Sequence, residues 1–436
     1  MVHLRSKIFC VFMAASTTLI APAMAQVVPP NANTTDPLAP FYIDVTGLDL
    51  STKPPTRDPN NPNYPPAKEL PDGQLPSVHA VGNFIIGPTH NAAPETIPDG
   101  AVPKGAVYSF TMNSANSVIY HTGVARDAPG NDPNAPTVPG DPSYLVMTSS
   151  HSGTWTRNVN VYVPDQYTGD KPAPFIVVGD GGLFDDLLFT TLDNMIHKGL
   201  LPPMVAITIE NGGQDAQGSQ RGVEYDTVSG TYAEFVEREV LPLVRRNVGV
   251  KLTKAARGRL ALGISSSGIA SFVMAWYHPE WYGRVVAFSP TFVNQQWPHN
   301  PALRGGGWEL HSPFAGPKGP LENTSNFGVP APSTIPDGSP LVLTSATKPI
   351  RFWFNVGDKD LFYPRQTMGD GMHDWVLAGE NMAKVLAAKG YQYQFVFARN
   401  AGHADAATMR QTLPQALQWV WSGYNPALKD REDSED

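Results

Sequence analysis

Short apolar runs alternate with helical patterns along the last 260 or so positions of the chain, as read from the printed sequence. Continuous apolar runs of four to eight residues are typical of buried strands, whereas apolar residues spaced three and four apart are typical of helices. The predicted strands are 175–178, 204–209, 260–262, 284–288, 350–355 and 393–397, and the predicted helices are 187–197, 232–246, 269–277, 374–389 and 408–421. Buried strands separated by helices predict an α/β fold with a mostly parallel sheet that is covered on both faces.

Two earlier segments, 106–112 and 159–163, alternate between apolar and polar residues and predict an antiparallel edge to this sheet. One long irregular segment, 293–348, interrupts the regular alternation. Loops of that length in a domain are usually functional or disordered. We interpret the segment as a substrate-binding lid, with a surface insertion as the alternative. The last residues, 427–436, are mostly charged and predict a solvated tail.

The first 25 residues have the form of a cleavable secretory signal. Arg5 and Lys7 supply the basic start, 8–20 is the apolar stretch, and 23–25 is an Ala-x-Ala cleavage site. A membrane anchor is the less favoured alternative, because the apolar run is short for a bilayer span. We therefore expect a periplasmic or secreted protein.

A Pro-rich arm follows the signal from residue 26 to about residue 100, where few residues are suited to a core. Its one apolar island, 83–88, is suited to docking on the main domain, and a rigid spacer is the alternative for the arm. The main domain is predicted to span 101–426.

Charge and cysteine content exclude several classes of function. Cys10 is the only cysteine and lies within the signal, so the exported protein has no disulfide framework, thiol nucleophile or thiolate metal site. Removal of Arg5 and Lys7 takes the net charge from −8 to −10. This acidic balance argues against nucleic acid and anionic membrane as partners.

Residues 260–268 have the pattern of a nucleophile elbow, a sharp strand-to-helix turn that exposes one serine hydroxyl. The G-x-S-x-G pattern is incomplete in both possible frames. The frame centred on Ser265 keeps Gly263 and has Ser267 in place of the second glycine. The frame centred on Ser266 keeps Gly268 but has a branched isoleucine in place of the first glycine. Because a branched residue fits the tight turn worse than a serine does, Ser265 is the predicted nucleophile.

A serine nucleophile requires a base, and the base requires a carboxylate that orients it. In the Ser–acid–His order of this type of site, the acid and the base follow later strands of the sheet. His403 follows the predicted strand 393–397 and precedes a helix, so it is the predicted base. Asp360 is favoured as the acid over Asp358, because the first acidic residue after such a strand commonly shapes the turn.

The negative oxygen that forms during ester cleavage must also be held by N–H donors. Ser266, directly after the nucleophile, is the first predicted donor. The second should come from the loop after an earlier strand, which is the stretch 179–182. Gly182 is favoured there, with Gly181 as the alternative, and a glycine-rich turn without function remains a further alternative.

Five stretches together resemble the esterase D branch of the α/β hydrolases, particularly the enterochelin esterase-like enzymes. They are 180–182 (DGG), 221–226 (RGVEYD), 263–266 (GISS), 277–283 (YHPEWYG) and 402–403 (GH). The similarity covers roughly 102–424. It implies an α/β-hydrolase fold and the roles of Ser265, Asp360 and His403 given above.

The resemblance also suggests that Arg221 and Glu224 border the substrate pocket, with an ion pair or a helix cap as the alternative. Aromatic side chains are predicted to line an aromatic-accepting pocket, although such residues more often belong to a core: Trp297, Trp308, Phe292 and Phe362. Ser267 departs from the family, which usually has glycine there.

Three functions are compatible with this sequence. The favoured one is an exported serine esterase that cleaves a small-molecule or saccharide-linked carboxylic ester through an acyl-enzyme, with no metal or organic cofactor required. The second is an acyltransferase of the same fold. The third is a non-catalytic binding protein on a hydrolase scaffold, against which the complete Ser–Asp–His set argues.

Overall fold

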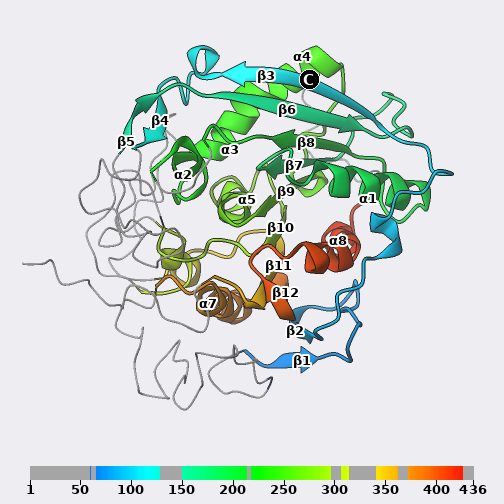
Figure 1. Cartoon of the computed structure of the whole chain (residues 1–436), viewed down its shortest axis with the longest axis vertical. Coiled ribbons are helices and arrows are strands. Elements are labelled where there is room, and N and C mark those ends of the chain that lie inside the picture. The colour runs from blue at the N-terminus through cyan, green and yellow to red at the C-terminus, as the bar shows by residue number, and fades with distance from the viewer. Residues whose placement is uncertain are drawn as a thin grey trace, which may run out of the picture.

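A sheet of ten strands runs through the middle of the molecule, with helices on both of its faces (Figure 1). The computed structural model describes residues 59, 65–127, 150–213, 218–295, 306–313, 340–361 and 372–425. The signal, most of the arm up to residue 64 and the charged tail lie outside these residues. Within them, the predicted α/β fold with a mostly parallel sheet is confirmed.

The strand order across the sheet is β1-β2-β12-β11-β10-β9-β7-β8-β6-β3. The antiparallel pairs are β3 with β6 and β6 with β8, and the remaining neighbours are parallel. The strands of the main sheet are β1 (Ala67–Glu69), β2 (Gly82–Ile86), β3 (Ala106–Asn113), β6 (Thr156–Val163), β7 (Phe175–Gly179), β8 (Val205–Ile209), β9 (Arg259–Ile264), β10 (Arg284–Phe288), β11 (Arg351–Lys359) and β12 (Gln392–Gly402). A separate hairpin pairs β4 (Gly123–Arg126) with β5 (Ser150–Gly153).

The α-helices are α1 (Asp185–His197), α2 (Gln220–Tyr225), α3 (Thr231–Phe235), α4 (Leu241–Val248), α5 (Ser266–Tyr277), α6 (Leu341–Thr344), α7 (Trp375–Ala388) and α8 (Ala406–Trp421). A π-helical turn, η4 (Val236–Val240), joins α3 to α4. The short 3₁₀ turns are η1 (Pro94–Thr96), η2 (Ser114–Asn116), η5 (Ala256–Gly258) and η6 (Gly307–Leu310). Helices α1 and α8 cover one face of the sheet, while α2 to α5 and α7 cover the other (Figure 1).

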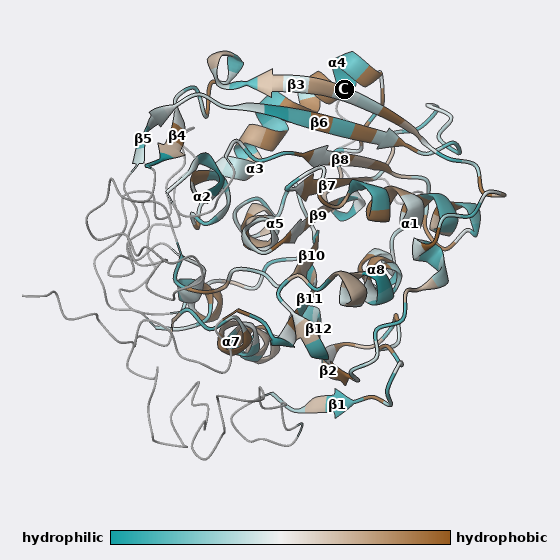
Figure 2. Ribbon diagram, in the orientation of Figure 1, coloured by the Kyte–Doolittle hydropathy of each residue, from teal (hydrophilic) through white to brown (hydrophobic). Residues whose placement is uncertain are grey.

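The core consists of two apolar layers, one on each face of the sheet. Helices α3, α5 and α7 bury their side chains in the larger layer, and α1 and α8 bury theirs in the smaller one. The strands between the layers are apolar on both sides, as in β9 and β10, which are mainly brown in Figure 2. This two-sided burial explains why these strands have continuous apolar sequences.

The parallel register brings the carboxyl ends of several strands to one edge of the sheet. Ile264 at the end of β9 pairs with Phe288 at the end of β10, and Lys359 at the end of β11 pairs with Gly402 at the end of β12. The residues that directly follow β9, β11 and β12 therefore lie near one another. In open α/β sheets, ligands bind at this edge.

The described part of the Pro-rich arm belongs to the main sheet. Strand β2 pairs with β12 in parallel, and β1 pairs with β2, so the arm extends the sheet beyond its last strand. The apolar island predicted to dock supplies most of β2. A boundary near residue 100 therefore does not separate the arm from the sheet, because β2 pairs with β12 of the main domain.

The segment predicted as a lid is described only in part. Its residues 306–313 include η6, which packs on the first turn after β10, since the Trp308 N–H donates to the Val293 carbonyl (3.2 Å). Residues 296–305 and 314–339 lie outside the described residues, so the lid stays a prediction. Among the helices that are described, none is long and apolar enough to cross a bilayer.

Candidate active site

The turn after β9 holds Ser265 in a strained backbone conformation. Its φ of 55° and ψ of −121° are unfavourable for a residue with a side chain. The turn is fixed on both sides, because the Ser265 N–H donates to the Phe288 carbonyl (2.9 Å) and the Thr291 N–H donates to the Ser265 carbonyl (3.1 Å). A side chain at Gly263 would place its Cβ 2.0 Å from the Ser267 carbonyl oxygen, so only glycine fits there. This geometry agrees with the predicted elbow.

Ser267, which replaces the second glycine of the elbow pattern, reinforces the turn. Its buried hydroxyl accepts from the Ile264 N–H (2.8 Å) and lies 2.8 Å from the Ile264 carbonyl, to which it donates. The extra Cβ is accommodated by Gly179 at the end of β7, where an added Cβ would lie 2.6 Å from that of Ser267. The glycine missing from the elbow is therefore compensated by a glycine on the neighbouring strand.

Ser265, His403 and Asp360 form a continuous hydrogen-bonded chain. The Ser265 hydroxyl lies 2.9 Å from His403 Nε2, and His403 Nδ1 lies 2.6 Å from Asp360 Oδ1. With Nδ1 protonated, the ring donates to the carboxylate and leaves Nε2 free to accept from the serine. Each of the three is the first residue after a parallel strand, namely β9, β12 and β11. The sheet register therefore assembles this constellation.

Asp358 and Asp360 have separate roles. The Asp358 carboxylate accepts from the Ala401 N–H (3.3 Å) and so ties the end of β11 to the loop that carries His403. Asp360 is buried and faces the histidine ring. The histidine ring also contacts Trp375 in a T-shaped arrangement, with the two ring centroids 5.6 Å apart. These contacts match the assignment of Asp360 as the partner of His403 and of Asp358 as a turn residue.

A second acidic group lies close to Asp360. Asp374 accepts from the Leu377 N–H (2.8 Å) and begins α7 as its N-cap. Burial raises the pKa of Asp374 to about 7, and the nearby charge of Asp360 contributes to the shift. Asp374 therefore keeps its proton to a higher pH than an exposed aspartate does.

The two predicted oxyanion donors differ in this structure. The Ser266 N–H is the first of α5 and, within the described residues, has no hydrogen-bond partner, as is usual in the first turn of a helix. The Gly182 N–H donates to the Asp185 carboxylate (3.1 Å). The alternative, Gly181, donates to the Ile209 carbonyl (2.8 Å). Ser266 is thus free to bind an oxyanion, while Gly182 would have to share its N–H, and its role stays a prediction.

Arg221 and Glu224 both occupy ion pairs, although they were predicted to border the substrate pocket. The Glu224 carboxylate is fully buried and pairs with Arg157 through both oxygens. The Glu224 side chain therefore belongs to a buried ion pair, which is the alternative given for it above. Arg221 is partly exposed and donates two hydrogen bonds, of 2.8 and 2.7 Å, to the Asp180 carboxylate. Burial opposes its charge, but the bonds and charge of Asp180 raise the pKa of Arg221 above its ordinary value.

The predicted aromatic pocket is only partly described. Trp308 and Phe292 are buried members of the core rather than pocket residues, because η6 packs closely onto the first turn of α5 and the segment after β10. Trp297 and Phe362 lie outside the described residues.

The structure adds two residues that the sequence did not single out. Thr291 lies after β10, and its hydroxyl is 3.5 Å from that of Ser265. Asp226, the residue after α2, is fully buried next to Ser266. Burial raises the pKa of Asp226 to about 6, against the opposing effect of the Arg221 charge. The only signal for Asp226 was its place at the end of the RGVEYD stretch.

Among the described residues, no three His, Cys, Asp or Glu side chains are arranged to hold a metal ion. The Asp185 carboxylate is instead bonded to protein donors, since it accepts from Asn160 (2.7 Å), Thr208 (3.0 Å) and the Gly182 N–H.

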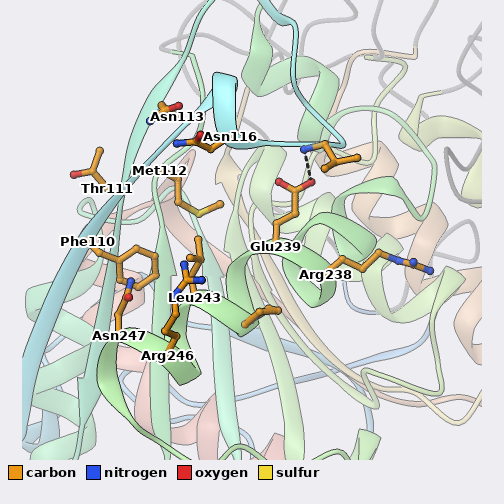
Figure 3. A pocket seen from close by; sticks show the side chains of 12 residues that line it. Phe110, Thr111, Met112, Asn113, Asn116, Arg238, Glu239, Leu243, Arg246 and Asn247 are labelled. Carbon is orange, nitrogen blue, oxygen red and sulfur yellow. Dashed lines mark hydrogen bonds between the residues drawn. The ribbon is translucent and has the colours of Figure 1, made fainter.

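A cavity of about 550 Å³ lies elsewhere, between β3 and the helical segment that runs from η4 into α4 (Figure 3). Phe110 and Met112 of β3 face Leu243 across it, and the Glu239 carboxylate accepts from the Val118 N–H (3.0 Å). The strands that carry Ser265, His403 and Asp360 do not line it. The cavity is therefore separate from Ser265.

The family model described as "Putative esterase" matches residues 150–420, more than half of the chain and all of the elements that carry the site. This chain belongs to that esterase family. The match confirms the resemblance seen in the sequence, and with the observed sheet it confirms the α/β-hydrolase fold. A comparison with curated proteins found no match.

Several solved structures are similar at low identity. An enterochelin esterase from Shigella flexneri is 18% identical, with 61% of this chain and 55% of that chain covered and a TM-score of 0.40. A ferulic acid esterase is 14% identical over 73% of this chain and 97% of its own, with a TM-score of 0.45. A feruloyl esterase module from Clostridium thermocellum, in complex with sinapinate, is 15% identical over 80% and 97%, with a TM-score of 0.42. The chain spans about half the length of the Shigella enzyme, and these likenesses are too distant to identify a substrate.

Proposed function

We propose that this protein is an exported serine esterase that hydrolyses a carboxylic ester through an acyl-enzyme. The observation that carries the proposal is the chain of hydrogen bonds from the Ser265 hydroxyl through His403 to Asp360, with distances of 2.9 and 2.6 Å. Membership of the esterase family supports the reaction class. The signal-like first 25 residues support export to the periplasm or the medium.

In the first half of the reaction, Ser265 Oγ attacks the ester carbonyl carbon as its proton passes to His403 Nε2. Asp360 stabilises the imidazolium that forms, because its buried carboxylate accepts from Nδ1–H. The carbonyl oxygen becomes an oxyanion, which the Ser266 N–H and the N-terminal end of α5 stabilise, with Gly182 as the proposed second donor. Collapse of this intermediate breaks the bond to the alcohol, which leaves with the proton from Nε2.

In the second half, His403 takes a proton from water as the water oxygen attacks the acyl carbon. A second oxyanion forms at the same position and collapses. The acid is released, and Ser265 regains its proton from His403. The cycle consumes one ester and one water and gives one acid and one alcohol, with no external oxidant, reductant or metal required.

Labelling with a fluorophosphonate probe tests this proposal, because the probe reacts with activated serines. We expect one adduct on the peptide that contains Ser265, together with turnover of p-nitrophenyl acetate. Both should be lost in Ser265→Ala, and turnover should fall by about 10³-fold or more in His403→Ala. An adduct on Ser266 would move the nucleophile by one position. An unlabelled and inactive wild-type protein would contradict the esterase proposal and favour a binding protein.

Product analysis with an added acceptor alcohol separates hydrolysis from acyl transfer. A hydrolase should release mainly free acid at moderate alcohol concentrations. A dominant ester of the acceptor would instead identify an acyltransferase, which uses the same acyl-enzyme.

A further inference from the structure

The short helix α2 contacts both segments that are proposed to hold the oxyanion. At its beginning, Arg221 binds the Asp180 carboxylate with two hydrogen bonds. At its end, the Tyr225 hydroxyl accepts from the Asp180 N–H (3.1 Å). Asp180 is the first residue after β7 and directly precedes Gly181 and Gly182. One helix thus fixes both the side chain and the backbone of the residue at the base of the glycine loop.

Asp180 needs such support, because its backbone lies in the left-handed region, with a φ of 56°. A third hydrogen bond comes from the Asn211 side-chain amide, 2.7 Å from the same carboxylate. The arginine is the bidentate partner and the one with charge, so it contributes most of the geometric restraint. Strain of this kind persists only where the surroundings hold it. The position of the glycine loop therefore depends on the Asp180–Arg221 pair.

The residue after α2 reaches the other segment. Asp226 is fully buried, accepts from the Gln295 side-chain amide (2.9 Å) and lies beside the Ser266 hydroxyl. Burial raises the pKa of Asp226 to about 6, and the neighbouring Ser266 hydroxyl acts against that rise. Asp226 is therefore a close neighbour of the first residue of α5, whose N–H has no hydrogen-bond partner among the residues that the structure describes.

We infer that Arg221 and Asp226 are positioning residues that hold the two donor segments of the oxyanion hole in place, Arg221 through Asp180 and Asp226 through Ser266. This inference rests on the proposed esterase function. Neither residue reacts with substrate in this scheme. Their effect is exerted at the transition state, where a donor displaced by a fraction of an ångström no longer meets the developing charge.

The variants Arg221→Met and Asp226→Ala test the inference, with p-nitrophenyl acetate as substrate and fluorophosphonate titration to count reactive sites. We expect kcat per titrated site to fall by about 10- to 100-fold with KM changed much less, because only transition-state binding is lost. The conservative variants Arg221→Lys and Asp226→Asn should recover part of the rate, since each keeps either the charge or the shape of the side chain. These conservative variants also test the inference if Arg221→Met or Asp226→Ala prevents folding.

Glu237→Gln is the matched control. Glu237 pairs with the buried Arg259 (3.0 Å) away from Ser265, so its loss should lower the melting temperature and leave kcat per site unchanged. If Arg221→Met and Asp226→Ala behave like this control, their role is structural and the inference is wrong. Failure of the esterase proposal itself looks different, because the wild-type protein would then show neither adduct nor turnover.

Discussion

Gly179 and Ser267 face each other between β7 and α5, and a Cβ on the glycine would lie 2.6 Å from the Cβ of the serine. Gly179→Ala should therefore lower the melting temperature strongly. Ser267→Gly alone should cost about 1–3 kcal/mol, because the Ile264 N–H loses its acceptor. The double variant combines Gly179→Ala with Ser267→Gly, and the clash is absent because position 267 then has no Cβ.

The double variant should consequently be more stable than the sum of the two single changes predicts, with a coupling of about 1–2 kcal/mol. Denaturant unfolding of the four proteins measures this coupling. Additive losses would show that Gly179 is needed for another reason, such as its contact with Tyr225.

Gly263→Ala should prevent formation of the elbow, since the new Cβ would lie 2.0 Å from the Ser267 carbonyl oxygen. We expect insoluble protein or soluble protein without fluorophosphonate labelling. Gly402→Ala is the control, because Gly402 precedes His403 yet has nothing within 4 Å of an added Cβ. Equal loss of labelling in both variants would mean that any change near the site is harmful.

Asp360→Asn should lower kcat by about 10²- to 10⁴-fold, because an amide can present its NH₂ group to His403 and stabilise the wrong tautomer. Asp358→Asn should stay within a few fold of the wild type, since its amide oxygen can still accept from the Ala401 N–H. Steady-state kinetics of the two variants show which aspartate supports catalysis. A reversed order of effects would reassign the acid to Asp358.

Asp226→Asn should stabilise the protein at neutral pH but not in acid. Burial raises the pKa of Asp226 from 3.8 to about 6, so the folded state keeps this proton longer than the unfolded state does. Ionisation of Asp226 therefore lowers the wild-type stability as pH rises from about 4 to about 6, and the loss persists above that range. The full effect is about 3 kcal/mol at most. Melting temperatures of both proteins at pH 4 and pH 7.5 should show a gap only at the higher pH.

The sequence predicted the central elements well because their signals are local. Strand β10 is predicted with the observed bounds, and the helices from α5 onwards agree within a few residues, apart from the short α6. Strands β1 and β2 could not be predicted in this way. They are short, lie between prolines, and are strands only because β12 offers an open edge more than 300 residues later.

The hydrogen-bonded arrangement of Ser265, His403 and Asp360 was predictable because each of them directly follows a strand in the expected order along the chain. The partners of these residues were not. Glu224 pairs with Arg157 from β6, and Asp226 lies next to Ser266. Both relationships depend on how α2 packs. Pairings between segments far apart leave no pattern in either segment alone, so a charged residue in a quoted motif is equally compatible with a pocket or with a buried pair.

The pairing of β2 with β12 joins an early segment of the chain to a late one. The Tyr393 hydroxyl donates to the Asn83 side chain across 310 positions of sequence, and the Gln394 amide donates to the Ala80 carbonyl across 314. A ribosome must therefore synthesise more than 300 further residues before β2 can pair with β12. Until then these strands have no place in the native sheet. Folding of this part is expected to be slow and post-translational, and removal of the C-terminal segment would expose hydrophobic strand edges from both ends of the chain.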